Sequence, residues 1–195
     1  NETKTGYTFS GWSEIPGTMP AHDVTITGSF TANNYKVNFD ANYPAAQQVA
    51  SQTVTFASPY GDLPEVTRTG YTLAGWYLDG VKVTKNTTVK TAGEHTRIAE
   101  WTPNTYKVNL DANGGSVAEE FIEVVYDQTF QGLPTPVLEG YDFVGWFNGE
   151  EQITSDTKVQ ITETITLKAR WNAAGDTPYK VEHYQQTLDG KYKLV

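Results

Sequence analysis

Histidines, cysteines and acidic side chains are the first residues to consider for chemistry in this chain. The three histidines, His22, His95 and His183, lie far apart, and no pair has the spacing of metal ligands on one element. The chain has no cysteine, which excludes a disulfide framework, a cysteine-based zinc site and thiol catalysis. The sequence therefore predicts neither a metal site nor a cofactor.

The paired carboxylates do not have the arrangement of an active site. Glu119-Glu120 and Glu150-Glu151 fall in predicted loops, where adjacent residues cannot flank a substrate as the acids of a glycosidase do. Residues 111–115 (DANGG) have a superficial likeness to a calcium loop but lack its alternating acidic ligands and closing glutamate, so a hairpin turn is favoured. No phosphate loop, dinucleotide fingerprint or Gly-x-Ser-x-Gly motif occurs. We predict no catalytic residue and no enzyme activity.

Aromatic side chains are the other candidates, because 5 Trp and 12 Tyr could stack on carbohydrate or form a protein interface. Those that recur at fixed positions are expected in the core, since small domains depend on large side chains for burial. Tyr43, Tyr60, Tyr77 and Phe147 lie in predicted turns or directly after a Gly-Trp step. We predict that these four are exposed and are the candidate ligand-binding aromatics.

His95 and Arg97 occupy positions where an apolar residue is expected. When the two longer repeats of the chain are aligned, these residues stand opposite Ile165 and Leu167. The favoured interpretation is a bulge or register change that exposes both and buries Ile98. The alternative is a polar binding patch specific to this part of the chain.

These residues are set in a repeating frame. Gly-Tyr-x-x-x-Gly-Trp occurs at 6–12, 70–76 and 140–146, and YKVN[F/L]DAN occurs at 35–42 and 106–113. The repeat predicts complete units at 35–101 and 106–171, the second half of a unit at 1–30 and the start of a further module at 179–195. The partial units predict a segment of a longer protein. The expected structural anchors are Gly6, Tyr7, Gly11, Trp12, Gly70, Tyr71, Gly75, Trp76, Trp101, Gly140, Tyr141, Gly145, Trp146 and Trp171.

Strand signals dominate each unit. Tyr106, Val108 and Leu110 alternate with polar residues, and Asn113-Gly114 is a turn signal. The link through Gly-x-Leu-Pro is too short and too rich in proline for a helix. We predict an all-β tandem array with four to five strands per unit and little or no helix.

The glycine before each repeated tryptophan has a specific consequence. Along a plain strand the Tyr of the motif and its Trp would face opposite sides, because side chains alternate. A glycine permits a bulge that changes this alternation. We predict such irregularities at Gly11, Gly75 and Gly145, each of which turns its tryptophan inward.

The ordered motifs resemble the Listeria–Bacteroides repeat, also called the internalin B-repeat. Residues 106–171 match almost throughout, and residues 35–101 match with two departures: Tyr43-Pro44 replaces Gly-Gly, and Arg97 replaces an aliphatic residue. The tail, 179–195, is similar to the start of a mucin-binding-protein-like module. The resemblance implies β-grasp-like modules with the helix reduced or absent, in extracellular stalk or adhesin proteins, largely of Gram-positive and gut bacteria. It implies no catalytic residues.

Charge and hydropathy restrict the partners. The net charge of −9 disfavours nucleic acid and anionic membranes, and no apolar run approaches the ~20 residues of a membrane-spanning helix. We predict a monomeric, non-catalytic stalk or spacer of a secreted protein of the bacterial cell wall and surface. Neighbouring domains of the same chain would be its partners, reached through short linkers at 31–34, 102–105 and 172–178. The alternatives are an adhesin module that binds a host glycan or extracellular-matrix protein, and an accessory region of a surface enzyme.

Overall fold

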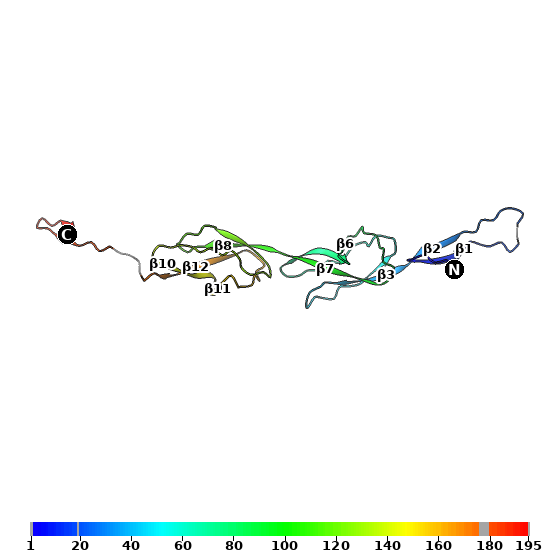
Figure 1. Ribbon diagram of the computed structural model, residues 1–195, viewed down its shortest axis with the longest axis horizontal. Helices are drawn as coiled ribbons and strands as arrows, with labels where there is room; N and C mark the ends of the chain where they lie inside the picture. Colours follow the sequence, from blue (N-terminus) through cyan, green and yellow to red (C-terminus); the bar gives the residue numbers. More distant parts are fainter. Residues whose placement is uncertain (1, 19, 176–179, 195) are drawn as a thin grey trace. The chain divides into compact units, whose positions relative to one another are not determined.

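The computed structural model describes residues 2–18, 20–175 and 180–194. All regular secondary structure in these ranges is β-strand (Figure 1). No helix long and apolar enough to cross a membrane occurs there. The chain divides into two compact units, Asn1–Asn104 and Thr105–Val195. The all-β prediction is confirmed.

The first unit contains a hairpin and a five-stranded sheet. The hairpin pairs β1 (Tyr7–Trp12) with β2 (Gly28–Ala32). The sheet has the order β4-β3-β7-β5-β6, in which β3 and β7 are parallel and the other neighbours are antiparallel. The bounds of its strands are β3 (Asn34–Asp40), β4 (Gln52–Thr55), β5 (Tyr71–Leu78), β6 (Val81–Val83) and β7 (His95–Pro103).

The second unit repeats this topology with the sheet order β11-β10-β12-β8-β9, and β8 is parallel to β12 (Figure 1). Its strands are β8 (Thr105–Asp111), β9 (Phe121–Val125), β10 (Tyr141–Asn148), β11 (Glu151–Ile153) and β12 (Ile165–Ala173). In chain order, each sheet runs 2-1-5-3-4 with parallel central strands, which is a β-grasp-like arrangement. The crossover from the second to the third strand is extended chain in place of the grasp helix.

The tail of the chain contains one further hairpin, β13 (Tyr184–Gln186) with β14 (Tyr192–Leu194). Tyr179 and Val195, which bound the expected further module, lie outside the described residues. A mucin-binding-like module at this end stays a prediction.

Each unit has its own hydrophobic core on one face of its sheet. Val108, Leu110, Leu167 and Ala169 are buried from the two parallel strands of the second unit, as their alternation predicts. The turn after β8 is confirmed, because Asn113 and Gly114 have φ angles of 50° and 96°. The Asp111 Oδ1 accepts the backbone N–H of Asn113 at 2.8 Å, so this carboxylate serves the turn.

The predicted irregularities at the glycines are also confirmed. The register shifts between Phe9 and Gly11, between Leu73 and Gly75, and between Phe143 and Gly145. The three glycines have φ angles of 110°, 151° and 154°, a region that other residues rarely adopt.

Two of the expected linkers are mostly strand. Thr31 and Ala32 belong to β2 and Asn34 begins β3, so only Asn33 joins them. Asn104 alone separates β7 from β8 in the same way. The third expected linker begins within β12, and its residues 176–178 lie outside the described part.

Candidate functional site

The repeated tryptophans of the two complete units are structural. Trp76 and Trp146 are each only 2% exposed, because the glycine bulge turns them into the core. Their Nε1–H groups donate to the backbone carbonyls of Pro64 and Pro134 at 2.9 and 2.8 Å, which ties the crossover chain to the sheet. A buried indole with its N–H satisfied stabilises the fold and offers no ring face to a ligand.

The second tryptophan of each unit has an equally regular role. Trp101 and Trp171 are half-buried, and their Nε1–H groups donate to the carbonyls of Ala41 and Ala112 at 2.7 and 3.0 Å. In each unit this hydrogen bond holds the turn after the first strand of the sheet (β3 or β8) against its last strand (β7 or β12).

Trp12 in the hairpin β1–β2 differs from its counterparts. The bulge at Gly11 is present, but Trp12 is 55% exposed and packs edge-on against Phe9, with ring centroids 5.2 Å apart. The prediction that all three tryptophans turn into a core is therefore wrong for Trp12. Among the described residues this sheet has only the two strands of the hairpin, and two strands cannot enclose an indole.

Tyr60, His95 and Arg97 form a buried polar cluster, which corrects two predictions. Tyr60 is 2% exposed rather than accessible to a ligand, and Arg97 is 3% exposed, while Ile98 is 45% exposed. The predicted bulge is absent, since β7 runs in unbroken register along β3 from Val37↔His95 to Asp40↔Ile98.

The cluster is held together by its own contacts. The Tyr60 hydroxyl lies 2.9 Å from His95 Nε2, and His95 Nδ1 lies 2.8 Å from the Gly93 carbonyl. If Nδ1 donates to this carbonyl, Nε2 of the neutral ring accepts the hydroxyl proton. The Arg97 guanidinium stacks 4.6 Å from the Tyr60 ring centroid, and burial lowers the pKa of Arg97. Its Nε has no hydrogen-bond partner in the described part of the chain. The cluster is closed to ligands, so a polar binding patch at His95 and Arg97 is not supported by this geometry.

The other predicted aromatic candidates, Tyr43, Tyr77 and Phe147, are half-buried rather than exposed. Tyr77 and Phe147 are half-buried at equivalent positions of β5 and β10, one in each unit. Arg170 covers the Phe147 ring at 4.2 Å from its centroid. Among the described residues, no group of three or more His, Cys, Asp or Glu side chains could hold a metal ion.

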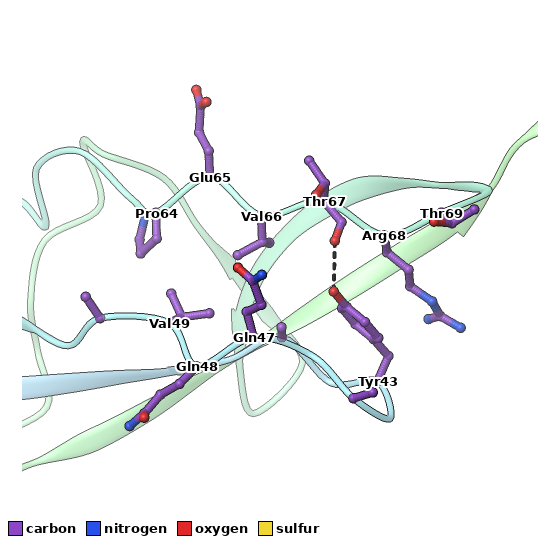
Figure 2. A pocket seen from close by; sticks show the side chains of 13 residues that line it. Tyr43, Gln47, Gln48, Val49, Pro64, Glu65, Val66, Thr67, Arg68 and Thr69 are labelled. Carbon is purple, nitrogen blue, oxygen red and sulfur yellow. Dashed lines mark hydrogen bonds between the residues drawn. The ribbon is translucent and has the colours of Figure 1, made fainter.

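Tyr43 lies in a groove of the first unit that runs beside the crossover chain (Figure 2). One wall is the chain after β3, and the other wall is the crossover between β4 and β5. The groove has a volume of about 860 Å³ and is lined by Ala41, Tyr43, Ala45, 47–50 and 64–69. The Tyr43 hydroxyl donates to the Thr67 carbonyl at 2.9 Å and bridges the two walls at one end (Figure 2).

Arg68 completes this end of the groove. Its guanidinium carbon lies 3.7 Å from the Tyr71 ring centroid and 5.4 Å from that of Tyr43. Sequence analysis missed Arg68 and Thr67 as site residues. The available signal was the replacement of Gly-Gly by Tyr43-Pro44, which marks where the first unit departs from the second.

Comparison with known families agrees with this architecture. The pattern of the Listeria–Bacteroides repeat domain matches residues 35–99 and 106–170, which fall within the two five-stranded sheets. The chain belongs to the Listeria–Bacteroides repeat family. In both Listeria–Bacteroides repeats of this chain, the residues that define the motif are those that form the bulge, the indole hydrogen bonds and the turn.

Proteins with similar sequences occur in other bacteria. A protein of Evansella cellulosilytica named "Putative Gly-rich membrane protein" is 29% identical over 88% of this chain and 23% of its own length. Internalin H of Listeria monocytogenes is 36% identical over 52% of this chain and 20% of its own length. The chain thus spans about a quarter or less of the length of these two relatives.

Among solved structures, tandem streptococcal SHIRT domains 3-4 from a cell surface protein match 72% of this chain and 98% of theirs. The sequence identity is 16% and the TM-score is 0.28. A TM-score this low carries no structural argument about the Listeria–Bacteroides repeats.

Proposed function

We propose that this chain is a non-catalytic repeat segment of a secreted bacterial cell-surface protein, in which it acts as a spacer. The match to Internalin H supports placing it in surface proteins of this type. The burial of the motif residues supports the spacer role, because the features that recur from unit to unit serve the fold rather than a ligand.

The observation that carries the proposal is the junction between the hairpin β1–β2 and the sheet that follows it. Asn33 is the single connecting residue; its N–H donates to the Gly6 carbonyl at 2.9 Å, and its carbonyl accepts the Phe56 N–H at 2.9 Å. The Phe56 ring packs edge-on against Tyr7 with centroids 5.4 Å apart. A Cβ on Gly6 would lie 2.4 Å from this ring, so only glycine permits the contact. A junction bonded in this way resists bending, as a spacer requires.

The spacer function is tested in the full-length surface protein by changing the number of repeats. Removal of residues 105–174, or their duplication, should shorten or lengthen the distance between the cell wall and the distal domain. Super-resolution imaging of a tag on the distal domain measures that distance. A distal tag whose height does not follow repeat number would contradict the spacer proposal.

An adhesin is the second candidate, and the groove at Tyr43 is the observation that favours it. A screen of the purified chain against host glycans and matrix proteins at physiological salt tests this function. Saturable binding that is lost in Tyr43→Ala but kept in Tyr77→Ala would assign an adhesin function to the groove. Binding lost in Tyr77→Ala or Phe147→Ala would place it on the sheets instead.

A further inference from the structure

The two repeats differ at the point where the chain after the first strand meets the crossover. In the second unit Ser116 and Val137 exchange two backbone hydrogen bonds, each of 2.8 Å. Gly115 allows this approach, because a Cβ there would lie 2.6 Å from the Val137 carbonyl oxygen and 2.8 Å from the Trp171 ring. The second unit therefore closes its crossover with its own chain.

The first unit cannot close in the same way. Tyr43-Pro44 stands where the second unit has Gly114-Gly115, and the chain turns at Tyr43, where the Ala46 N–H donates to the Tyr43 carbonyl. Thr67 corresponds to Val137, and among the described residues its carbonyl accepts a hydrogen bond only from the Tyr43 hydroxyl. The groove in Figure 2 is the space between these two walls.

The walls of the groove carry unused backbone groups. Within the described part of the chain, the N–H groups of Glu65 and Thr67 make no hydrogen bond, nor do those of Gln47, Gln48 and Val49. A volume of about 860 Å³ is in the range of ligand sites, roughly 300–1,000 Å³. The carbonyl groups of an extended chain beside residues 65–67 could accept hydrogen bonds from these N–H groups, as the carbonyls of an added β-strand do.

Arg68 gives one end of the groove a positive charge. The lining also contains one carboxylate, that of Glu65, which points away from the opposite wall (Figure 2). Arg68 is the only cation among the lining residues, and no carboxylate of the described chain lies within ion-pair distance of it. The Tyr71 and Tyr43 rings hold its guanidinium in place. A held guanidinium with free N–H groups binds a carboxylate through two hydrogen bonds.

We propose that the groove of the first unit binds an extended peptide segment that carries an acidic side chain. The peptide backbone pairs with the Thr67 and Glu65 N–H groups, as in strand addition, and its carboxylate binds Arg68. An oligosaccharide fits less well, because Tyr43 is the only aromatic residue in the lining and its ring already contacts Arg68 and Trp101. This inference goes beyond the spacer function and does not depend on it.

The probe is a fluorescein-labelled peptide with the sequence of residues 111–120 (DANGGSVAEE), the segment that meets the equivalent crossover in the second unit. Fluorescence anisotropy with the whole chain should show saturable binding. Amide NMR shifts in the ¹⁵N-labelled chain should fall on Glu65, Thr67 and Arg68. Arg68→Gln should weaken binding about tenfold, because the charge-assisted pairing with the carboxylate is lost. A probe with Gln and Asn in place of its acidic residues should lose a similar amount and be insensitive to Arg68→Gln.

The matched control closes the groove. The double variant Tyr43→Gly/Pro44→Gly restores the Gly-Gly of the second unit and should weaken peptide binding at least about tenfold, with an unchanged circular dichroism spectrum. The proposal is overturned if anisotropy does not saturate at millimolar concentration, if the shifts fall elsewhere, or if the closed variant binds equally well. It is also overturned if cellotetraose shifts the groove amides and the peptide does not. None of these outcomes changes what the repeat-number experiment measures, so the peptide-binding proposal and the spacer proposal are tested separately.

Discussion

At the scale of single residues, the two complete repeats show two solutions for the same core positions. Tyr60, His95 and Arg97 stand where the second unit has Phe130, Ile165 and Leu167. The polar set is satisfied only in part, because the buried Arg97 makes no ion pair among the described residues. Buried charges are costly, and well-packed apolar replacements are often neutral or more stable.

The triple variant Tyr60→Phe/His95→Ile/Arg97→Leu should therefore stabilise the first unit, by about 1–4 kcal/mol. His95→Ile alone should destabilise it by about 1–3 kcal/mol, because the buried Tyr60 hydroxyl loses its partner. Hydrogen exchange followed by mass spectrometry reports the free energy of opening for residues 34–103 separately. The reverse triple in the second unit, Phe130→Tyr/Ile165→His/Leu167→Arg, is the matched control and should destabilise it. A triple variant less stable than the parent chain would mean that the polar cluster contributes net stability.

At the scale of strands, the glycine bulge decides where the tryptophan points. Gly75 has a φ of 151°, where a side chain is strained, and a Cβ there would lie 2.6 Å from Lys82 Cε. Gly75→Ala should cost the first unit about 1–3 kcal/mol, mostly from the backbone, because the lysine side chain can move away. Urea unfolding followed by the fluorescence of the tryptophans measures the loss.

Gly93 provides the control for this substitution within the same unit. It is not among the glycines with positive φ, and a Cβ there would meet no atom within 4 Å. Gly93→Ala should leave stability unchanged or raise it by about 0.4–1 kcal/mol. Equal effects at Gly75 and Gly93 would show that the bulge does not require glycine.

The strands, the bulges and the absence of a helix in the described chain could be predicted because each depends on neighbouring residues. The alternation of apolar and polar residues predicts that Val108 and Leu110 are buried. A glycine before a repeated tryptophan predicts the bulge that turns the indole to the core face of the sheet. Tyr60 was misplaced because its burial depends on His95, 35 residues away along the chain. Comparing the repeats position by position would have paired the substitutions at 60, 95 and 97. The replacement of Gly-Gly by Tyr43-Pro44 marks where the groove lies, but its width depends on the distance between two loops, which the sequence pattern does not give.

At the scale of the whole molecule, the two hydrophobic cores share no residue. One draws on residues between Val37 and Ala99, and the other on residues between Val108 and Ala169. Because the cores share no residue, each should stabilise the folding of its own unit. A unit of about 70 residues buries a modest share of its surface, so the free energy of unfolding of each unit should be small.

Leu167→Ala tests this separation, because Leu167 is fully buried at the centre of the second core. The cavity should cost about 2–5 kcal/mol, enough to remove most of the stability of a unit of this size. Hydrogen exchange should rise through residues 105–173 and stay unchanged through 34–103. Arg97→Ala at the equivalent position of the first unit is the reciprocal variant, and any change it causes should be confined to residues 34–103. Loss of protection in both units from either substitution would mean that they fold as one cooperative body. A spacer built from such units could then not lose or gain one repeat without affecting the next.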